Sequence, residues 1–150
     1  MRHFMTLALL GWLGLGAPAH AWELTKGPDH AATFTTDGDY LLSISCQRGR
    51  DHLEFGLNDR TLRGDGFEAV RAVMMWIKAP DGRTDKWSIE VSQEGPSLTG
   101  RIAFSARTLD FFGNAESLEV EDIFGRRTLL RSDMKGTGAA RIAFRERCGI

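Results

Sequence analysis

The sequence predicts an antiparallel fold, α+β or mainly β: a sandwich-like sheet of about seven or eight short strands with one or two short helices and one disulfide. Three observations support this prediction. Apolar and polar residues alternate over short segments, turn-forming residues separate those segments, and helical spacing occurs only in short stretches near the end. The absence of long helices alternating with the strands argues against a parallel doubly wound fold.

The segment from residue 22 to residue 58 predicts a β-hairpin. Residues 22–32 are polar and contain Gly27 and Pro28, so we expect a loop, and a short strand follows at 33–36. Residues 40–46 and 52–58 each alternate between apolar and polar side chains, which indicates two half-buried strands. The apolar faces consist of Leu42, Ile44 and Cys46 in one strand and Leu53, Phe55 and Leu57 in the other.

Three more strands are expected in the middle of the chain. After a glycine-containing loop over 58–66, residues 68–78 are rich in strand-forming side chains, and strands over 86–91 and 98–104 follow the turn at 80–83. Met74, Met75 and Trp76 stand in the first of these strands. They can form an adaptable contact surface, but we expect a core segment in which one of the two methionines faces outward.

The last third combines two helices with a strand pair. Ser105 is expected to cap a helix over 106–112, which Gly113 ends. Strands are expected at 117–122 and 127–131, around a turn at 124–126. Residues 139–147 favour a helix with Ala140, Ala143 and Phe144 on one side, whereas a strand carrying Ile142 and Phe144 is the alternative.

The first 21 residues are predicted to be a secretory signal peptide. A short positive start is followed by an apolar stretch from Phe4 to about Gly16, which is shorter than a membrane-spanning helix. The small residues Ala19 and Ala21 suit signal peptidase, so cleavage is expected between Ala21 and Trp22. Residues 22–150 would then be one periplasmic or secreted domain.

The two cysteines, Cys46 and Cys148, are expected to form a disulfide, because an exported protein meets an oxidising compartment. Closing a loop of roughly 100 residues would contribute up to about 4.7 kcal/mol in the chain-entropy model. The alternative is a catalytic thiol, which needs a nearby group that lowers its pKa. His30 and His52, the histidines of the mature chain, stand in no recognisable cysteine-protease motif.

Composition and motifs give no cofactor or metal site. The net charge of −1 argues against nucleic acid as a general partner. Two histidines are too few for a convincing zinc site, and the loop residues Asp59, Asp65, Asp81 and Asp85 lack calcium-loop spacing. Ser132 and Lys135 match a Ser-x-x-Lys spacing, but the partner motifs of penicillin-binding enzymes are absent.

Glu119 and Glu121 are the candidate catalytic carboxylates. On a strand they share one face, and Asp122 follows them, so a pair that hydrolyses glycosidic bonds is one interpretation. Leu118 and Val120 alternate with them, and Ile123 follows Asp122. The interpretation we favour is therefore the solvent face of an amphipathic strand.

The order of several motifs resembles the TagO/VasI type of type VI secretion-associated periplasmic proteins, which have one disulfide. The matching pieces are the segments 42–46 and 81–82, Trp87, the short helix at 106–112, and residues 136–139 leading through a helix to Cys148. The resemblance implies an accessory or binding protein and carries over no catalytic residue. We therefore expect a non-enzymatic periplasmic protein, linked to a secretion system, that contacts an envelope protein or a peptidoglycan-related component. The alternatives are an inhibitor of a lysozyme-type enzyme and a carboxylate-based envelope hydrolase.

Overall fold

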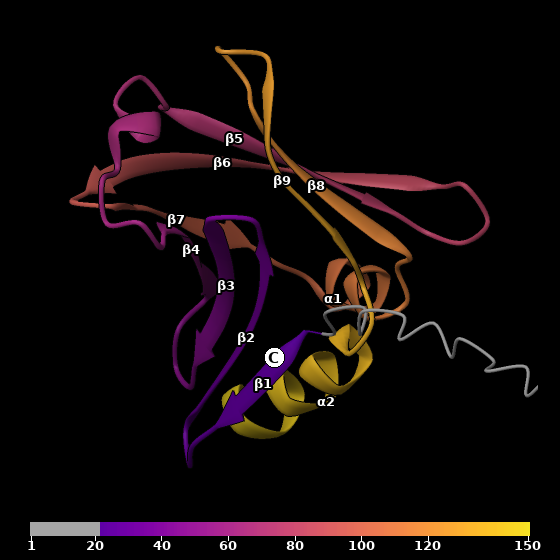
Figure 1. Cartoon of the computed structure of the whole chain (residues 1–150). Coiled ribbons are helices and arrows are strands. Elements are labelled where there is room, and N and C mark those ends of the chain that lie inside the picture. Colours follow the sequence, from indigo (N-terminus) through magenta and orange to yellow (C-terminus); the bar gives the residue numbers. More distant parts are fainter. Residues whose placement is uncertain (1–21) are drawn as a thin grey trace, which may run out of the picture.

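The computed structural model describes residues 22–150, and within them nine strands form one curled antiparallel sheet with two short helices at one end (Figure 1). The order of strands is β1-β2-β3-β4-β7-β6-β5-β8-β9. This confirms the predicted fold class. The strands are β1 (Glu23–Lys26), β2 (His30–Asp37), β3 (Tyr40–Gln47), β4 (His52–Asp59), β5 (Ala72–Lys78), β6 (Thr84–Glu94), β7 (Ser97–Ala103), β8 (Ser117–Asp122) and β9 (Arg127–Asp133), and the helical elements are η1 (Asp65–Phe67), α1 (Ala106–Gly113) and α2 (Thr137–Cys148).

The sheet turns a corner at β6. Residues 84–90 of this strand pair with β5, whereas residues 91–94 pair with β7. At the point of change Val91 lies opposite Gly100 of β7. A Cβ atom on Gly100 would lie 2.6 Å from both the carbonyl oxygen of Glu90 and Cγ2 of Ile89, so only glycine allows this close approach. The bend gives the sheet its half-barrel shape.

Side chains, and not a ladder of main-chain hydrogen bonds, join β9 to β2 across the open side of the half-barrel. The hydroxyl groups of Thr35 and Ser132 are 3.0 Å apart. The main-chain N–H of Arg131 donates to the carboxylate of Asp37 over 2.9 Å. Trp22 closes the lower part of the same seam, because its main-chain N–H donates to the carbonyl of Lys135 and its indole N–H to that of Asp133.

Two helices cover one end of the half-barrel, and the predicted disulfide fixes the second. Ser105 caps α1 through the main-chain N–H of Thr108, as the sequence predicts. In α2, the exposure of Ile142 and the burial of Ala140, Ala143 and Phe144 confirm the helix and exclude the alternative strand. Cys46 of β3 is bonded to Cys148 at the end of α2, with 6.1 Å between the two Cα atoms.

The core lies between the inner faces of the sheet and the helices. An aromatic cluster fills the helical end: the ring of Phe112 lies edge to face with Trp22, with centroids 5.5 Å apart, and is stacked with Trp87 at 5.8 Å. Met75 is buried and Met74 is half-buried, so one methionine faces outward as expected.

Two segments differ from the sequence predictions. The expected loop over 22–32 contains β1 and the start of β2. β1 has the sequence ELTK and is mostly exposed, so it carries no apolar alternation and is recognised only by its pairing with β2. The expected strand at 68–78 begins only at Ala72, because a turn at 68–69 follows η1. The predicted signal peptide, 1–21, lies outside the described residues, and no helix within 22–150 has the length and apolarity to cross a membrane.

We expect the disulfide to contribute substantially to stability. Replacing both Cys46 and Cys148 by alanine should lower the free energy of unfolding by about 2–5 kcal/mol, because the unfolded chain loses its long-range cross-link. Urea unfolding followed by circular dichroism measures the change. Adding a reductant should lower the stability of the wild-type protein and leave the double variant unchanged. A loss below about 1 kcal/mol would show that the bridge is dispensable.

The corner glycine gives a second prediction. Gly100→Ala should lower the free energy of unfolding by about 1–3 kcal/mol, because the added carbon meets main chain that cannot move independently. Gly56→Ala on β4 is the matched control: its Cβ would lie 2.6 Å from the hydroxyl of Ser43, which can rotate away, and at an ordinary 3.8 Å from the side-chain amide of Asn58. Equal effects of the two substitutions in the same urea experiment would argue against a special constraint at the corner.

Candidate functional site

The outward-facing side chains of β6, β5, β8 and β9 form a regular polar surface, which we call the platform. Its side chains align in three rows across the four strands, because each residue lies directly opposite its neighbour in the register. The rows are Thr84-Lys78-Ser117-Asp133, Lys86-Trp76-Glu119-Arg131 and Ser88-Met74-Glu121-Thr128. The opposite faces of these strands point into the core, so the platform has a rigid base.

A β-bulge in β9 completes the platform. Val120 of β8 lies opposite Leu130, but Glu121 lies opposite Thr128, so Leu129 is an extra residue. In a regular strand, residues three apart point to opposite faces. The bulge therefore allows Thr128 and Arg131 to share the outer face, while both Leu129 and Leu130 are buried.

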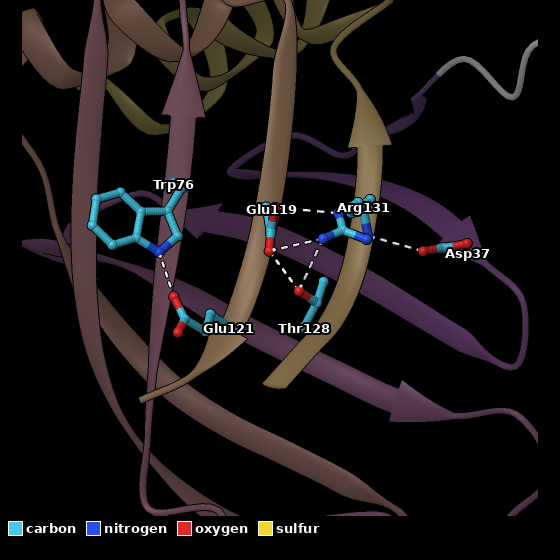
Figure 2. A network of polar contacts seen from close by, with 6 residues as sticks. All are labelled: Asp37, Trp76, Glu119, Glu121, Thr128 and Arg131. Atoms are coloured by element: carbon cyan, nitrogen blue, oxygen red, sulfur yellow. Dashed lines mark hydrogen bonds and ion pairs between the residues drawn. The ribbon is translucent and has the colours of Figure 1, made fainter. Parts of the chain in front are cut away.

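Glu119 lies at the centre of a hydrogen-bonded cluster (Figure 2). The Thr128 hydroxyl donates to its carboxylate over 2.5 Å, and the Arg131 guanidinium donates over 3.2 and 3.3 Å. The hydrogen bond from Thr128, followed by the contacts with Arg131, lowers the pKa of Glu119 below its ordinary value. Glu119 is therefore an ionised, immobilised carboxylate at neutral pH.

Trp76 provides the apolar part of the platform. Its side chain is 36% exposed, whereas Trp22 and Trp87 are buried. The indole N–H donates to the carboxylate of Glu121 over 2.8 Å, which fixes the orientation of the ring (Figure 2). An exposed aromatic ring held by its polar edge presents its apolar body to a ligand.

A groove of about 550 Å³ crosses the platform beside Trp76. The polar residues that line it provide hydroxyl, carboxylate and cationic groups: Lys78, Thr84, Ser117, Glu119, Arg131, Ser132 and Asp133. Other grooves on the molecule are as large, so the lining of this groove, and not its volume, distinguishes it. The arrangement can bind a ligand that has both an apolar face and many hydrogen-bonding groups.

The predicted carboxylate candidates Glu119 and Glu121 do share one face, but their surroundings suit binding better than acid catalysis. A glycosidase acid needs a raised pKa so that it carries a proton at neutral pH. Glu119 has a lowered pKa, and Glu121 accepts the Trp76 N–H. Asp122 points inward, accepts the N–H groups of Phe124 and Gly125, and lies 3.6 Å from Arg127. It therefore supports the β8–β9 turn.

The other residues that the sequence marks as candidates make contacts that support the fold. Both cysteines are in the disulfide, and Ser132 lies on β9 with its hydroxyl bonded to the carbonyl of Asp133, so Ser132 and Lys135 do not share a helix. The carboxylates of Asp59 and Asp81 accept hydrogen bonds from Thr61 and Arg83 respectively.

The two histidines line one groove beside Cys46. His52 lies between the carboxylates of Asp51 and Glu54, 2.8 and 2.9 Å from its ring nitrogens, and these hydrogen bonds raise its pKa, Asp51 contributing most. Within residues 22–150 no group of three or more His, Cys, Asp or Glu side chains is arranged to hold a metal ion.

Sequence reasoning placed Trp76 in the core and assigned no role to Thr128 or Arg131. The signal for Trp76 was present, because Val73, Met75 and Ile77 alternate with Met74 and Trp76 and only the first set is buried. No pattern in the sequence marks the bulge that brings Thr128 and Arg131 to one face.

The chain was compared with protein-family models, curated proteins and solved structures, and none of them matches it. The assignment of the candidate site therefore rests on the geometry of the platform alone.

The lowered pKa of Glu119 predicts a pH dependence of stability. A carboxylate with a lowered folded-state pKa stabilises the protein above its unfolded-state pKa of 4.5, and this contribution disappears as the pH falls through the folded-state value. The stability difference between the wild type and Glu119→Gln should be constant near neutral pH and shrink below about pH 4.5. Urea unfolding at several pH values measures it. Glu68→Gln, at an exposed site outside the platform, is the control, and the same pH profile there would contradict the prediction.

Proposed function

We propose that this protein is a non-enzymatic binding protein of the bacterial cell envelope, periplasmic or secreted, and that the platform is its contact surface. The observation that carries the proposal is a partly exposed Trp76, fixed by Glu121, in the middle of a polar sheet face on which Glu119 and Arg131 also hold each other in place. Its partner would be an envelope protein or a cell-wall component.

The disulfide supports the location. A bridge between Cys46 and Cys148 that joins distant segments is typical of proteins that fold in oxidising compartments. The predicted signal peptide, 1–21, is consistent with export. The role in type VI secretion that the sequence resemblance implies stays a prediction.

The rigidity of the platform supports binding. Sites on strands are held more precisely than sites on loops, and fixed side chains lose little conformational entropy when a ligand binds. Trp76 and Glu119 both meet this condition through their hydrogen bonds. Within residues 22–150 the other exposed large apolar side chains lie elsewhere: Leu62 on a loop, Phe124 in a turn and Ile142 on α2.

Site-specific crosslinking tests the proposal. A photoreactive benzoylphenylalanine at Lys86, on the platform, should yield adducts with an envelope extract or with purified cell wall. The same group at Ile142, which is 51% exposed on α2, should yield few. Arg131→Glu should reduce adduct formation from position 86, because it places like charges beside Glu119 and disturbs the platform.

Adducts of equal yield from both positions, or none from either, would contradict the platform as the contact surface. Circular dichroism of each variant serves as the folding control.

A further inference from the structure

We propose that the ligand of the platform is an uncharged or zwitterionic glycan whose sugar ring stacks on Trp76. This inference rests on the proposed function, since it names the class of ligand that the same surface binds. It follows from the juxtaposition of one exposed indole with a balanced set of hydrogen-bonding groups across four strands.

The apolar contact is central. Trp76 has Lys86 on one side and Glu119 on the other in its row, and Arg131 follows Glu119. A pyranose ring presents C–H groups on its faces and hydroxyl groups around its edge. Stacked on the indole, it would bury those C–H groups on the aromatic body and direct its hydroxyls toward the flanking polar side chains.

The carboxylates keep capacity for such hydroxyls. An ionised carboxylate has about four acceptor positions. Glu119 accepts three hydrogen bonds, one from Thr128 and two from Arg131, whereas Glu121 accepts one from Trp76. Glu121 therefore has the larger free capacity directly beside the indole. The exposed Lys78 and Lys86 add donors, and Thr84 and Ser117 add hydroxyls that donate and accept.

The balance of charged side chains on the platform argues against a polyanionic ligand. Lys78, Lys86 and Arg131 carry three positive charges in the three rows, and Glu119, Glu121 and Asp133 carry three negative ones. The balance is zero, whereas nucleic acids and anionic membranes are bound by surfaces with an excess of Lys and Arg. A ligand without net charge fits this surface.

The residue composition of the platform argues against a stable interface with another protein. The buried centre of such an interface is about 65% apolar and poor in charged residues. The three rows contain only two large apolar side chains, Trp76 and the half-buried Met74, among twelve positions, of which six are charged. A glycan needs only a small apolar contact surrounded by hydrogen bonds.

The dimensions suit a short oligosaccharide. Adjacent strands lie about 4.8 Å apart, so a row across four strands spans roughly 14 Å. The groove beside Trp76, of about 550 Å³, is lined by residues of all four strands. Because the indole and the Glu119 carboxylate are already fixed, binding costs little ordering of the protein.

The experiment uses the exported protein and a defined probe, the tetramer of β-1,4-linked N-acetylglucosamine, with a sulfated tetrasaccharide as the anionic comparison. Isothermal titration and tryptophan fluorescence measure binding. The uncharged tetramer should bind and change the fluorescence, because Trp76 is the exposed one of the three described tryptophans. The sulfated probe should bind at least about tenfold more weakly.

Substitutions identify the surface. Trp76→Ala should weaken binding of the uncharged tetramer at least about tenfold, and Trp76→Phe, which keeps an aromatic face, should weaken it less. Phe124→Ala is the matched control, since Phe124 is an aromatic residue 72% exposed outside the platform, and it should leave the affinity unchanged. Urea unfolding shows whether each variant remains folded.

Three results would overturn the glycan inference: no binding of the uncharged tetramer at millimolar concentration, unchanged binding by folded Trp76→Ala, or preference for the sulfated probe. These failures are distinguishable from failure of the proposed function. Adducts between position 86 and an envelope protein, with no glycan binding, would leave the platform as a contact surface for protein. The absence of both would remove the two proposals together.

Discussion

The shape of the molecule depends on the close approach of two main chains at the corner of the sheet. β6 pairs with β5 up to Glu90 and with β7 from Val91 onward, and Gly100 leaves the space that this change of partner needs. Because the sheet bends there, β9 reaches β2 and the two inner faces enclose one core. The two helices then cover the end that the sheet leaves open (Figure 1), and the disulfide ties α2 to β3 there.

The packing of the core also determines which side chains form the platform on the outer face of the sheet. Strand alternation requires that every buried residue of β5 and β8 has neighbours that face outward, so the burial of Met75 and Val120 fixes the positions of Trp76 and Glu119. In β9 alternation alone would place Thr128 and Arg131 on opposite faces. The bulge at Leu129 removes this conflict, because it puts two consecutive leucines in the core and both polar residues outside.

The sequence predicted the parts of the fold in which one face is apolar. The hairpin of β3 and β4, the capped helix α1 and the disulfide follow from alternation, an N-cap and the two cysteines. β1 was missed because an exposed edge strand needs no apolar face. The platform was only partly predictable: Glu119 and Glu121 share a face by period, but the contacts of Glu119 with Arg131 depend on a bulge and on strand order, which are properties of tertiary packing.

Arg131 takes part both in the contact between β9 and β2 that closes the half-barrel and in the platform on the outer face. Its main-chain N–H is bound by Asp37 across the seam, and its side chain holds Glu119 on the platform (Figure 2). Arg131, at the end of the row through Trp76, is therefore also held by a contact between strands that are far apart in the sheet order. A ligand that binds the row binds the folded protein only, since the unfolded chain has no such row. Binding on the row therefore stabilises the folded state relative to the unfolded chain.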